Sequence, residues 1–212
     1  MRFLAALLAA APLISALEAA PLLATTQPRI IYSKSFPGSA PAYFQIVLDK
    51  NGAAEYKEDP KDDNPLRFQL TEAECSAIFA LADKLDHFSR PLESGLKVAN
   101  MGAKTLRFEG DGPPHETKFN YSDDLDAKTI ADWFERIAES ERNYIALERA
   151  VRFDKLGVQD AILQIEILRN QKRLVAEKQF LPMLDRVANN ESYMHMARTR
   201  AAALAESIRA SR

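Results

Sequence analysis

The pattern of apolar and polar residues changes period near residue 121. Before that point, short runs alternate, as from Tyr43 to Leu48, where Phe44 and Ile46 share one face with Leu48. A period of two residues is typical of a β-strand with one buried face. We therefore expect strands at residues 29–33, 43–48, 53–57, 66–70, 96–99, 104–109 and 116–121.

A turn signal and a helix signal interrupt these strands. Asn51-Gly52 predicts a hairpin between the second and third strands, because a type I′ turn needs positive φ at both central residues. Thr71 and Glu74 form a capping box, which predicts a helix from there to about Asp86. The apolar face of that helix holds the single cysteine, which we expect to be buried: Cys75, Ile78, Phe79, Ala82 and Leu85.

After residue 121 the apolar positions follow a helical period to the end of the chain. Ser122, Asp123 and Asp124 form an N-cap cluster before a long periodic stretch at 125–153. Gly157 breaks the pattern, and further helical faces follow at 161–168, 180–187 and 193–208. The sequence thus predicts an α+β fold, with a small antiparallel sheet and one amphipathic helix followed by an all-helical C-terminal half.

This change of period divides the expected chain into three parts. A segment at 1–24 precedes an α+β domain at 25–124 and a helical region at 125–212, which is HEAT-like or built of helical hairpins. Whether the last two are separate domains stays open, because the helix at 125–153 could pack on the sheet.

The first 24 residues have the pattern of a secretory signal peptide. Arg2 precedes an apolar run from Phe3 to Leu17, and small residues follow, with cleavage left open among several alanines. The run is shorter than the roughly 20 residues of a membrane span, although an uncleaved anchor remains an alternative. Because no cysteine follows the run, we expect an exported protein, periplasmic or secreted, without a lipid anchor.

Composition narrows the function classes. The chain has 212 residues, 47% hydrophobic and 27% charged, with a formal net charge of -2, as in ordinary globular proteins. This charge gives no footprint for nucleic acid. After signal cleavage we expect no stable membrane span, and one cysteine permits no intramolecular disulfide.

The strand-rich half resembles a bacterial exported domain of unknown function. Members of that family read C-F-G-x-C-P-x-Y, then an alternating strand, D-G and a later tyrosine. The resemblance covers about residues 29–140 and implies the fold and export, with no activity to transfer. The family's two cysteines are absent here, so no disulfide or thiol role carries over. The matching positions are Ser35 to Tyr43, with Ser35 and Ala40 near the missing cysteines, Asn51-Gly52 and Tyr56.

A weaker resemblance concerns the C-terminal helices. Phe180 to Leu184, a break at Asn189-Asn190 and Ala197 to Leu204 look like one HEAT-type repeat, in which Pro182 would kink the first helix. Such repeats normally need at least three copies for stability, and no second copy is visible at that period. A generic helical hairpin is therefore the favoured interpretation.

No motif in the sequence names a reaction. The three histidines, His87, His115 and His195, stand in separate segments without metal-ligand spacing. The chain has no G-x-S-x-G motif and no glycine-rich phosphate loop. We therefore expect no cofactor, no metal and no recognisable catalytic residue.

One segment, 94–102, is a candidate for ligand or partner contact. Two glycines frame Lys97 and Asn100 between apolar residues, an arrangement that could present both side chains as donors. Tyr43 and Tyr56 complete the set of candidate contacts. The alternative is an ordinary connection into the strand at 104–109.

Three hypotheses for function follow. The leading one is a non-enzymatic binding or protein-interaction module of the cell envelope, with another envelope protein as partner. The alternatives are a periplasmic hydrolase with scattered catalytic residues and an inhibitor or accessory subunit of another exported protein. Polar groups converging near Lys97, Asn100 and the turn at Pro37–Pro41 would favour the enzyme, and a wide apolar patch on the helical half would favour the accessory subunit.

Overall fold

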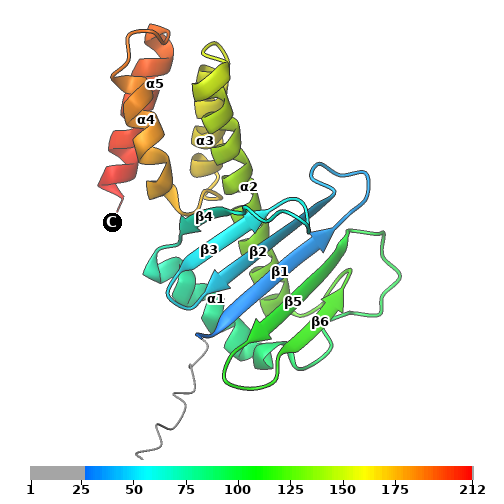
Figure 1. Cartoon of the computed structure of the whole chain (residues 1–212). Coiled ribbons are helices and arrows are strands. Elements are labelled where there is room, and N and C mark those ends of the chain that lie inside the picture. Colours follow the sequence, from blue (N-terminus) through cyan, green and yellow to red (C-terminus); the bar gives the residue numbers. More distant parts are fainter. Residues whose placement is uncertain (1–26, 212) are drawn as a thin grey trace, which may run out of the picture.

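The computed structural model describes residues 27–211, which form an α+β fold (Figure 1). The strands are β1 (Arg29–Ser35), β2 (Tyr43–Asp49), β3 (Ala53–Lys57), β4 (Leu66–Gln69), β5 (Ala103–Glu109) and β6 (His115–Phe119). The helices are α1 (Glu72–Lys84), α2 (Leu125–Phe153), α3 (Val158–Asn170), α4 (Leu181–Ala188) and α5 (His195–Ala210), with 3₁₀ turns η1 (Asp86–Phe88) and η2 (Glu177–Phe180). The signal peptide expected at 1–24 lies outside the described residues.

The strands form one antiparallel sheet in the order β4-β3-β2-β1-β5-β6. β1 lies in the middle, and Tyr32 stands opposite Ile46 on β2 and Leu106 on β5. These three side chains are fully buried, whereas their neighbours Ile31 and Ser33 point to the other face. The alternation expected from the sequence is confirmed, because a strand buries every second side chain.

Two local predictions differ from the structure. Residues 96–99 form a loop and not a strand. The hairpin at Asn51-Gly52 is present, but the turn is not type I′, because Gly52 has a φ of 86° and Asn51 has none above zero. The amide of Gly52 donates to the Asp49 carbonyl at 2.9 Å, and a Cβ at Gly52 would lie 2.9 Å from the Leu70 carbonyl oxygen. Glycine is therefore required there for both conformation and space.

Helix α1 begins at the predicted capping box. The Thr71 hydroxyl accepts from the Glu74 amide at 3.3 Å, and the Thr71 amide donates to the Glu74 carboxylate at 2.8 Å. These bonds satisfy two amides that the first helical turn leaves free. The predicted apolar face, which includes Cys75, is buried against the sheet.

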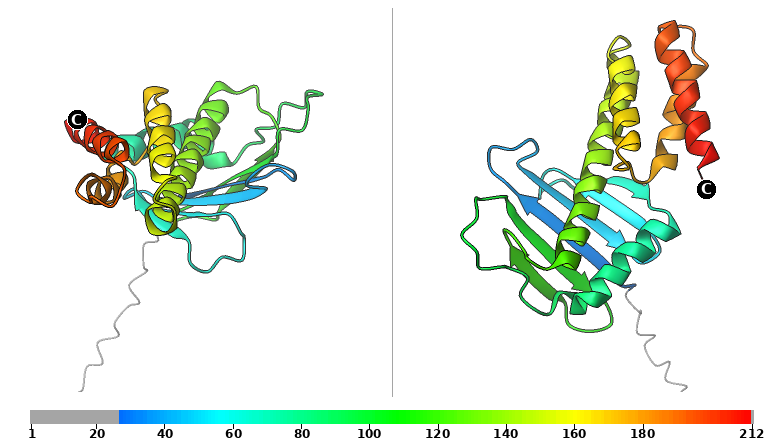
Figure 2. Two further views of the ribbon diagram at one scale, coloured as in Figure 1. Left: turned by 90° about the horizontal axis from the view of Figure 1, so that it is seen from above. Right: turned by 180° about the vertical axis from the view of Figure 1, so that it is seen from behind.

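One face of the sheet is covered by helices, and the other is not. Figure 2 shows α1 and the first half of α2 lying across the sheet, and no helix of the described range on its other side. The covered face forms a core in which the ring of Tyr32 stacks on Phe134 of α2, with centroids 4.9 Å apart. The odd-numbered residues of β1 and β2 point to the uncovered face, so they stay partly accessible.

The long helix α2 passes from the first core into a second one. Its residues up to Ala138 pack with the sheet, whereas those from Leu147 onward pack with α3, α4 and α5. The boundary expected at 124/125 coincides with the start of α2, but the two cores meet further along, within α2. In the helical half α4 and α5 pack as a pair, and Pro182 lies in the first turn of α4 rather than at a kink.

Within residues 27–211, no helix combines the length and the hydropathy of a membrane-crossing segment.

Candidate functional site

The segment between η1 and β5 is a loop whose two ends lie together at the end of β6. The Ser94 amide donates to the Tyr121 carbonyl at 2.9 Å, at the start of the loop. At its end, the Met101 amide donates to the side-chain oxygen of Asn120 at 2.7 Å, and the Asn120 side-chain nitrogen donates to the Ala99 carbonyl at 3.0 Å. We call residues 94–101 the clamped loop. Compact loops with joined ends frequently carry function.

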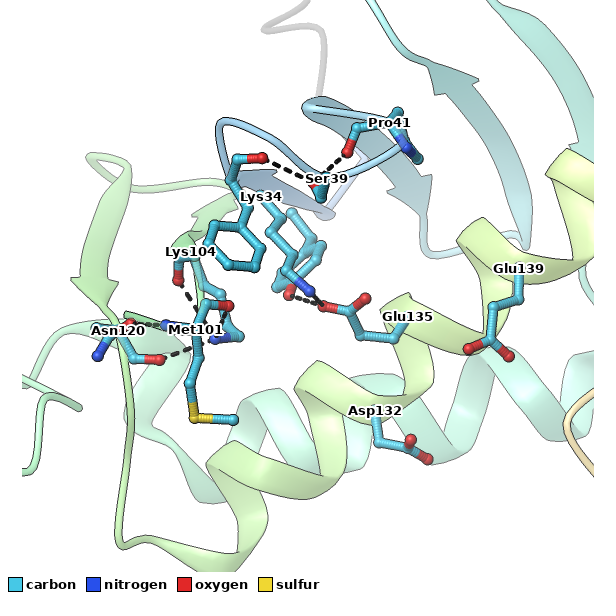
Figure 3. A network of polar contacts seen from close by, with 12 residues as sticks. Lys34, Ser39, Pro41, Met101, Lys104, Asn120, Asp132, Glu135 and Glu139 are labelled. Atoms are coloured by element: carbon cyan, nitrogen blue, oxygen red, sulfur yellow. Dashed lines mark hydrogen bonds and ion pairs between the residues drawn. The ribbon is translucent and has the colours of Figure 1, made fainter. Parts of the chain in front are cut away.

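Asn120 is the residue that closes this loop. Its backbone amide donates to the Glu93 carboxylate at 2.6 Å, and its carbonyl accepts from the Lys104 ammonium at 2.8 Å. With its two side-chain bonds, every polar group of Asn120 has a partner, so its orientation is fixed. Figure 3 shows Asn120, Met101 and Lys104 joined by these contacts.

Lys104 ties the clamped loop to the sheet. Besides the Asn120 carbonyl, its ammonium donates to the carbonyls of Gly102 at 3.3 Å and Met101 at 3.4 Å. Burial, and then the neighbouring charge of Lys34, lower the pKa of Lys104. The two lysines are direct partners across β1 and β5.

A carboxylate of α2 balances this pair of lysines. The Lys34 ammonium lies 2.8 Å from Glu135, and the Tyr32 hydroxyl donates to the same oxygen at 3.1 Å. Figure 3 shows Lys34 and Glu135 pointing toward each other from β1 and α2. Two sets of polar contacts therefore lie next to each other, one joining Lys34 to α2 and the other joining Lys104 to the neck of the clamped loop.

The clamped loop presents apolar side chains to solvent. Leu96, Val98 and Met101 are all exposed large hydrophobic residues. Lys97 stands between the first two, is exposed, and pairs with no acidic side chain among the described residues. A small set of exposed apolar side chains on a fixed backbone is a typical feature of a contact surface.

Two of the four predicted contact residues lie on this loop. Lys97 is exposed at its tip, as expected for a donor. Asn100 instead bonds within the loop, because its side-chain oxygen accepts from the Gly102 amide at 2.9 Å. Asn100 therefore shapes the turn into β5, and only the nitrogen of its side-chain amide remains to donate to a partner.

The two predicted tyrosines lie away from the loop and on opposite faces of the sheet. Tyr43 is on the uncovered face, where its hydroxyl donates to Gln45 at 3.3 Å. Tyr56 is buried in the core, and its hydroxyl donates to Glu58 at 2.7 Å. The structure thus brings Lys97 and Asn100 together and leaves Tyr43 and Tyr56 in separate environments.

The turn at Pro37–Pro41 lies over a small cavity of about 160 Å³. Lys34, Glu135 and Arg142 are among its lining residues. The charges of Lys34 and Glu135 already pair with each other, and the Ser39 hydroxyl donates to the turn's own carbonyls. Polar groups do converge near the turn, and of those named only the Arg142 side chain forms no hydrogen bond or ion pair with the described residues.

The carboxyl group with the strongest shift lies elsewhere, in the middle of α2. Burial raises the pKa of Glu141 to about 8, and its side chain is 0% exposed. The Gln179 amide donates to one carboxyl oxygen at 2.7 Å, while the other has no partner among the described residues. Because Glu141 is sealed between the two cores, no reactant in solution reaches it.

A concavity of about 670 Å³ lies between the first turn of α1 and the end of α5. Its wall includes Glu72, Glu177 and Ile208. Glu74 in the same wall already caps α1 and accepts from the Ala176 amide at 3.2 Å. Within residues 27–211, no three His, Cys, Asp or Glu side chains are close enough to hold a metal ion.

No family model matches the chain, and no curated protein matches it either.

Proposed function

We propose that the protein is an exported, non-enzymatic binding module of the cell envelope, and that the clamped loop is its contact with a partner protein. The observation that supports this proposal is the pairing of an exposed apolar tip with a fixed neck. Leu96, Val98 and Met101 face solvent, while Asn120 and Lys104 hold the ends of the loop.

A fixed loop binds with a smaller entropic cost than a mobile one. Ordering the backbone costs about 1–2 kcal/mol for each residue, so eight mobile residues would offset most of a small interface. Burying an apolar side chain contributes about 1.5–3 kcal/mol, and three are available. Because the hydrogen bonds at the neck already order the clamped loop, the free energy of burying these side chains is not offset by the cost of ordering it.

The side chains exposed on the clamped loop indicate what surface the partner would need. Three apolar side chains require a shallow apolar depression, and Lys97 requires a carboxylate at its rim. Lys97 sets the orientation of the loop, because its charge is the only one between residues 94 and 101. If the partner is an enzyme, the protein is an inhibitor or accessory subunit, which is a special case of this proposal.

The hydrolase alternative has less support. A catalytic acid or base needs access to substrate as well as a shifted pKa. Glu141 has the shifted pKa but no access, and Lys34 and Glu135 are occupied by each other.

Photo-crosslinking tests the proposal in the full-length chain. A benzoylphenylalanine placed at Leu96 is expected to give one discrete adduct in the envelope, and the same group at Ile167 is expected to give none. Ile167 is the control because it is an exposed apolar residue of α3, in the helical half. Adding Lys97→Glu or Val98→Asp is expected to abolish the adduct.

The purified partner then provides the quantitative measurement. Leu96→Asp is expected to raise the Kd for the partner at least tenfold, because roughly 1.5 kcal/mol is lost when a leucine is no longer buried in the interface. Equal adducts from positions 96 and 167, or an unchanged Kd for Leu96→Asp, would contradict the proposal.

A further inference from the structure

The far end of the helical half is formed by two turns that lie side by side. One turn joins α2 to α3, and the other joins α4 to α5; both stand at the end of the helices away from the sheet (Figures 1 and 2). The Tyr193 hydroxyl donates to the Val151 carbonyl at 3.0 Å, and the Lys155 ammonium lies 5.9 Å from the centre of the Tyr193 ring. We call residues 149–157 and 189–198 the bundle tip.

The bundle tip exposes large apolar side chains. Phe153 is 81% exposed and Leu156 is 73% exposed, and Met194 and Met196 are exposed beside them. Four of the ten exposed large hydrophobic residues among the described residues therefore gather in two short turns. Tyr193 and Val151 hold the turns together from within, so the exposed side chains are not needed for that contact.

The charge of the bundle tip differs from that of the whole chain. Arg149, Arg152 and Lys155 outnumber Asp154 in the first turn, and Arg198 balances Glu191 in the second, so the net charge is +2 against -2 for the chain. Arg152 pairs with Glu148, one helical turn nearer the sheet, and counting Glu148 leaves the tip positive. Arg149 and Lys155 pair with no carboxylate in the described part of the chain.

We propose that the bundle tip binds the surface of an anionic bilayer. Phe153 and Leu156 enter the boundary between headgroups and acyl chains, and Arg149 and Lys155 lie against the anionic headgroups. Each basic residue near such a surface adds an electrostatic attraction that salt weakens. Binding is shallow and reversible, because only two turns reach the membrane.

A bilayer fits this surface better than a second copy of the chain does. Two copies meeting tip to tip would bring like charges together. The exposed apolar side chains stand beside basic ones without a carboxylate partner in the described range, which is the combination that an anionic bilayer surface accommodates. The clamped loop lies on a different part of the molecule, so this inference does not depend on the proposed function.

Sedimentation of residues 25–212, which lack the apolar N-terminal segment, with vesicles tests the inference. The wild type is expected to bind vesicles of phosphatidylcholine mixed with phosphatidylglycerol and to bind phosphatidylcholine alone more weakly. Phe153→Ser with Leu156→Ser is expected to lower binding at least roughly tenfold, whereas Leu125→Ser, the control at an equally exposed leucine, leaves it unchanged. Arg149→Gln with Lys155→Gln is expected to lower binding to the anionic vesicles and to reduce its salt dependence.

A fluorophore reports whether the tip itself enters the bilayer. Cys75 is buried, so Leu156→Cys can be labelled selectively with a polarity-sensitive dye, and Leu125→Cys gives the control. A blue shift on adding anionic vesicles is expected only for the label at 156. Circular dichroism verifies that each variant is folded. Failure of the wild type to sediment, equal binding by the serine variant, or equal shifts at both positions would overturn the inference, as would binding of acidic proteins alone.

Discussion

The sheet half and the helical half build their cores from different side chains. The core under the sheet contains eight buried aromatic residues, whereas the core of the helical half contains two, Phe180 and Tyr193. Helices crossing a sheet leave a wide layer that large rings fill, while α4 and α5 approach closely through small residues. The small residues of the second core are Ala150, Ala197, Ala201 and Ala205.

The exposed apolar residues of the two halves differ in the same way. In the sheet half they lie on a loop that Asn120 and Lys104 hold in one shape. In the helical half they lie on turns with flexible side chains and a positive charge. A fixed surface suits one partner of matching shape, whereas an adaptable one suits a fluid surface. The two proposed contacts therefore differ in the kind of surface that each would recognise.

The largest expected effect tests whether the halves unfold separately. Phe134→Ala removes the ring that stacks on Tyr32 and is expected to cost roughly 3–5 kcal/mol. Because Phe134 lies on α2, which both cores share, protection of amides in both halves is expected to fall. Leu204→Ala in α5 is expected to cost roughly 2–5 kcal/mol and to lower protection in α3, α4 and α5 first.

Native-state hydrogen exchange measures this difference. The amides of β1 are expected to keep their protection in Leu204→Ala while those of α5 lose it. Equal loss of protection in β1 and α5 would mean that the two cores form one cooperative unit.

The next effect concerns Glu141, which lies where the cores meet. Its pKa is raised from 4.5 to about 8, so the folded protein keeps the proton over a range in which the unfolded chain has lost it. Stability therefore falls as pH rises from about 4.5 to about 8 and levels off above 8. Glu141→Gln removes this loss and is expected to stabilise the protein by roughly 3 kcal/mol at pH 7, with no gain at pH 4.

Urea unfolding at several pH values measures the effect of Glu141. The control Glu206→Gln, at an exposed position of α5, is expected to change stability by less than about 0.5 kcal/mol. A gain for Glu141→Gln that is the same at pH 4 and pH 7 would show that burial of the carboxyl is not its cause.

The sequence was sufficient where a pattern is local. Alternation predicted β1 to β6 closely, and the capping box at Thr71 and Glu74 marked the start of α1. The burial of Cys75 followed from the helical period. These features depend on residues within one turn or one strand of each other, which a single sequence displays.

The candidate site was harder to predict from the sequence, because its contacts join residues that are far apart in the chain. Residues 96–99 alternate like a strand, but alternation does not reveal whether a pairing strand is present. Asn120 was missed because its side chain bonds to residues about 20 positions earlier, Ala99 and Met101. The signal that could have revealed it is an asparagine at the expected end of a strand, where its side chain often bonds to backbone. Tyr56 follows the same rule, because only the pairing of Tyr56 with Ile46 places it in the core.

The smallest effect tests the rigidity on which the contrast between loop and tip rests. Asn120→Ala removes the bonds to the Ala99 carbonyl and the Met101 amide, which become free to bond with water. Because the groups stay accessible, we expect a cost of only about 1 kcal/mol in global stability. The Met101 amide, however, is expected to exchange much faster, since its only described acceptor is lost. Asn189→Ala is the matched control, because its side chain bonds to the Asp185 carbonyl in the helical half. If exchange at Met101 is the same in both variants, the loop is held by Lys104 and Glu93 rather than by the Asn120 side chain, and its rigidity comes from the backbone of β6.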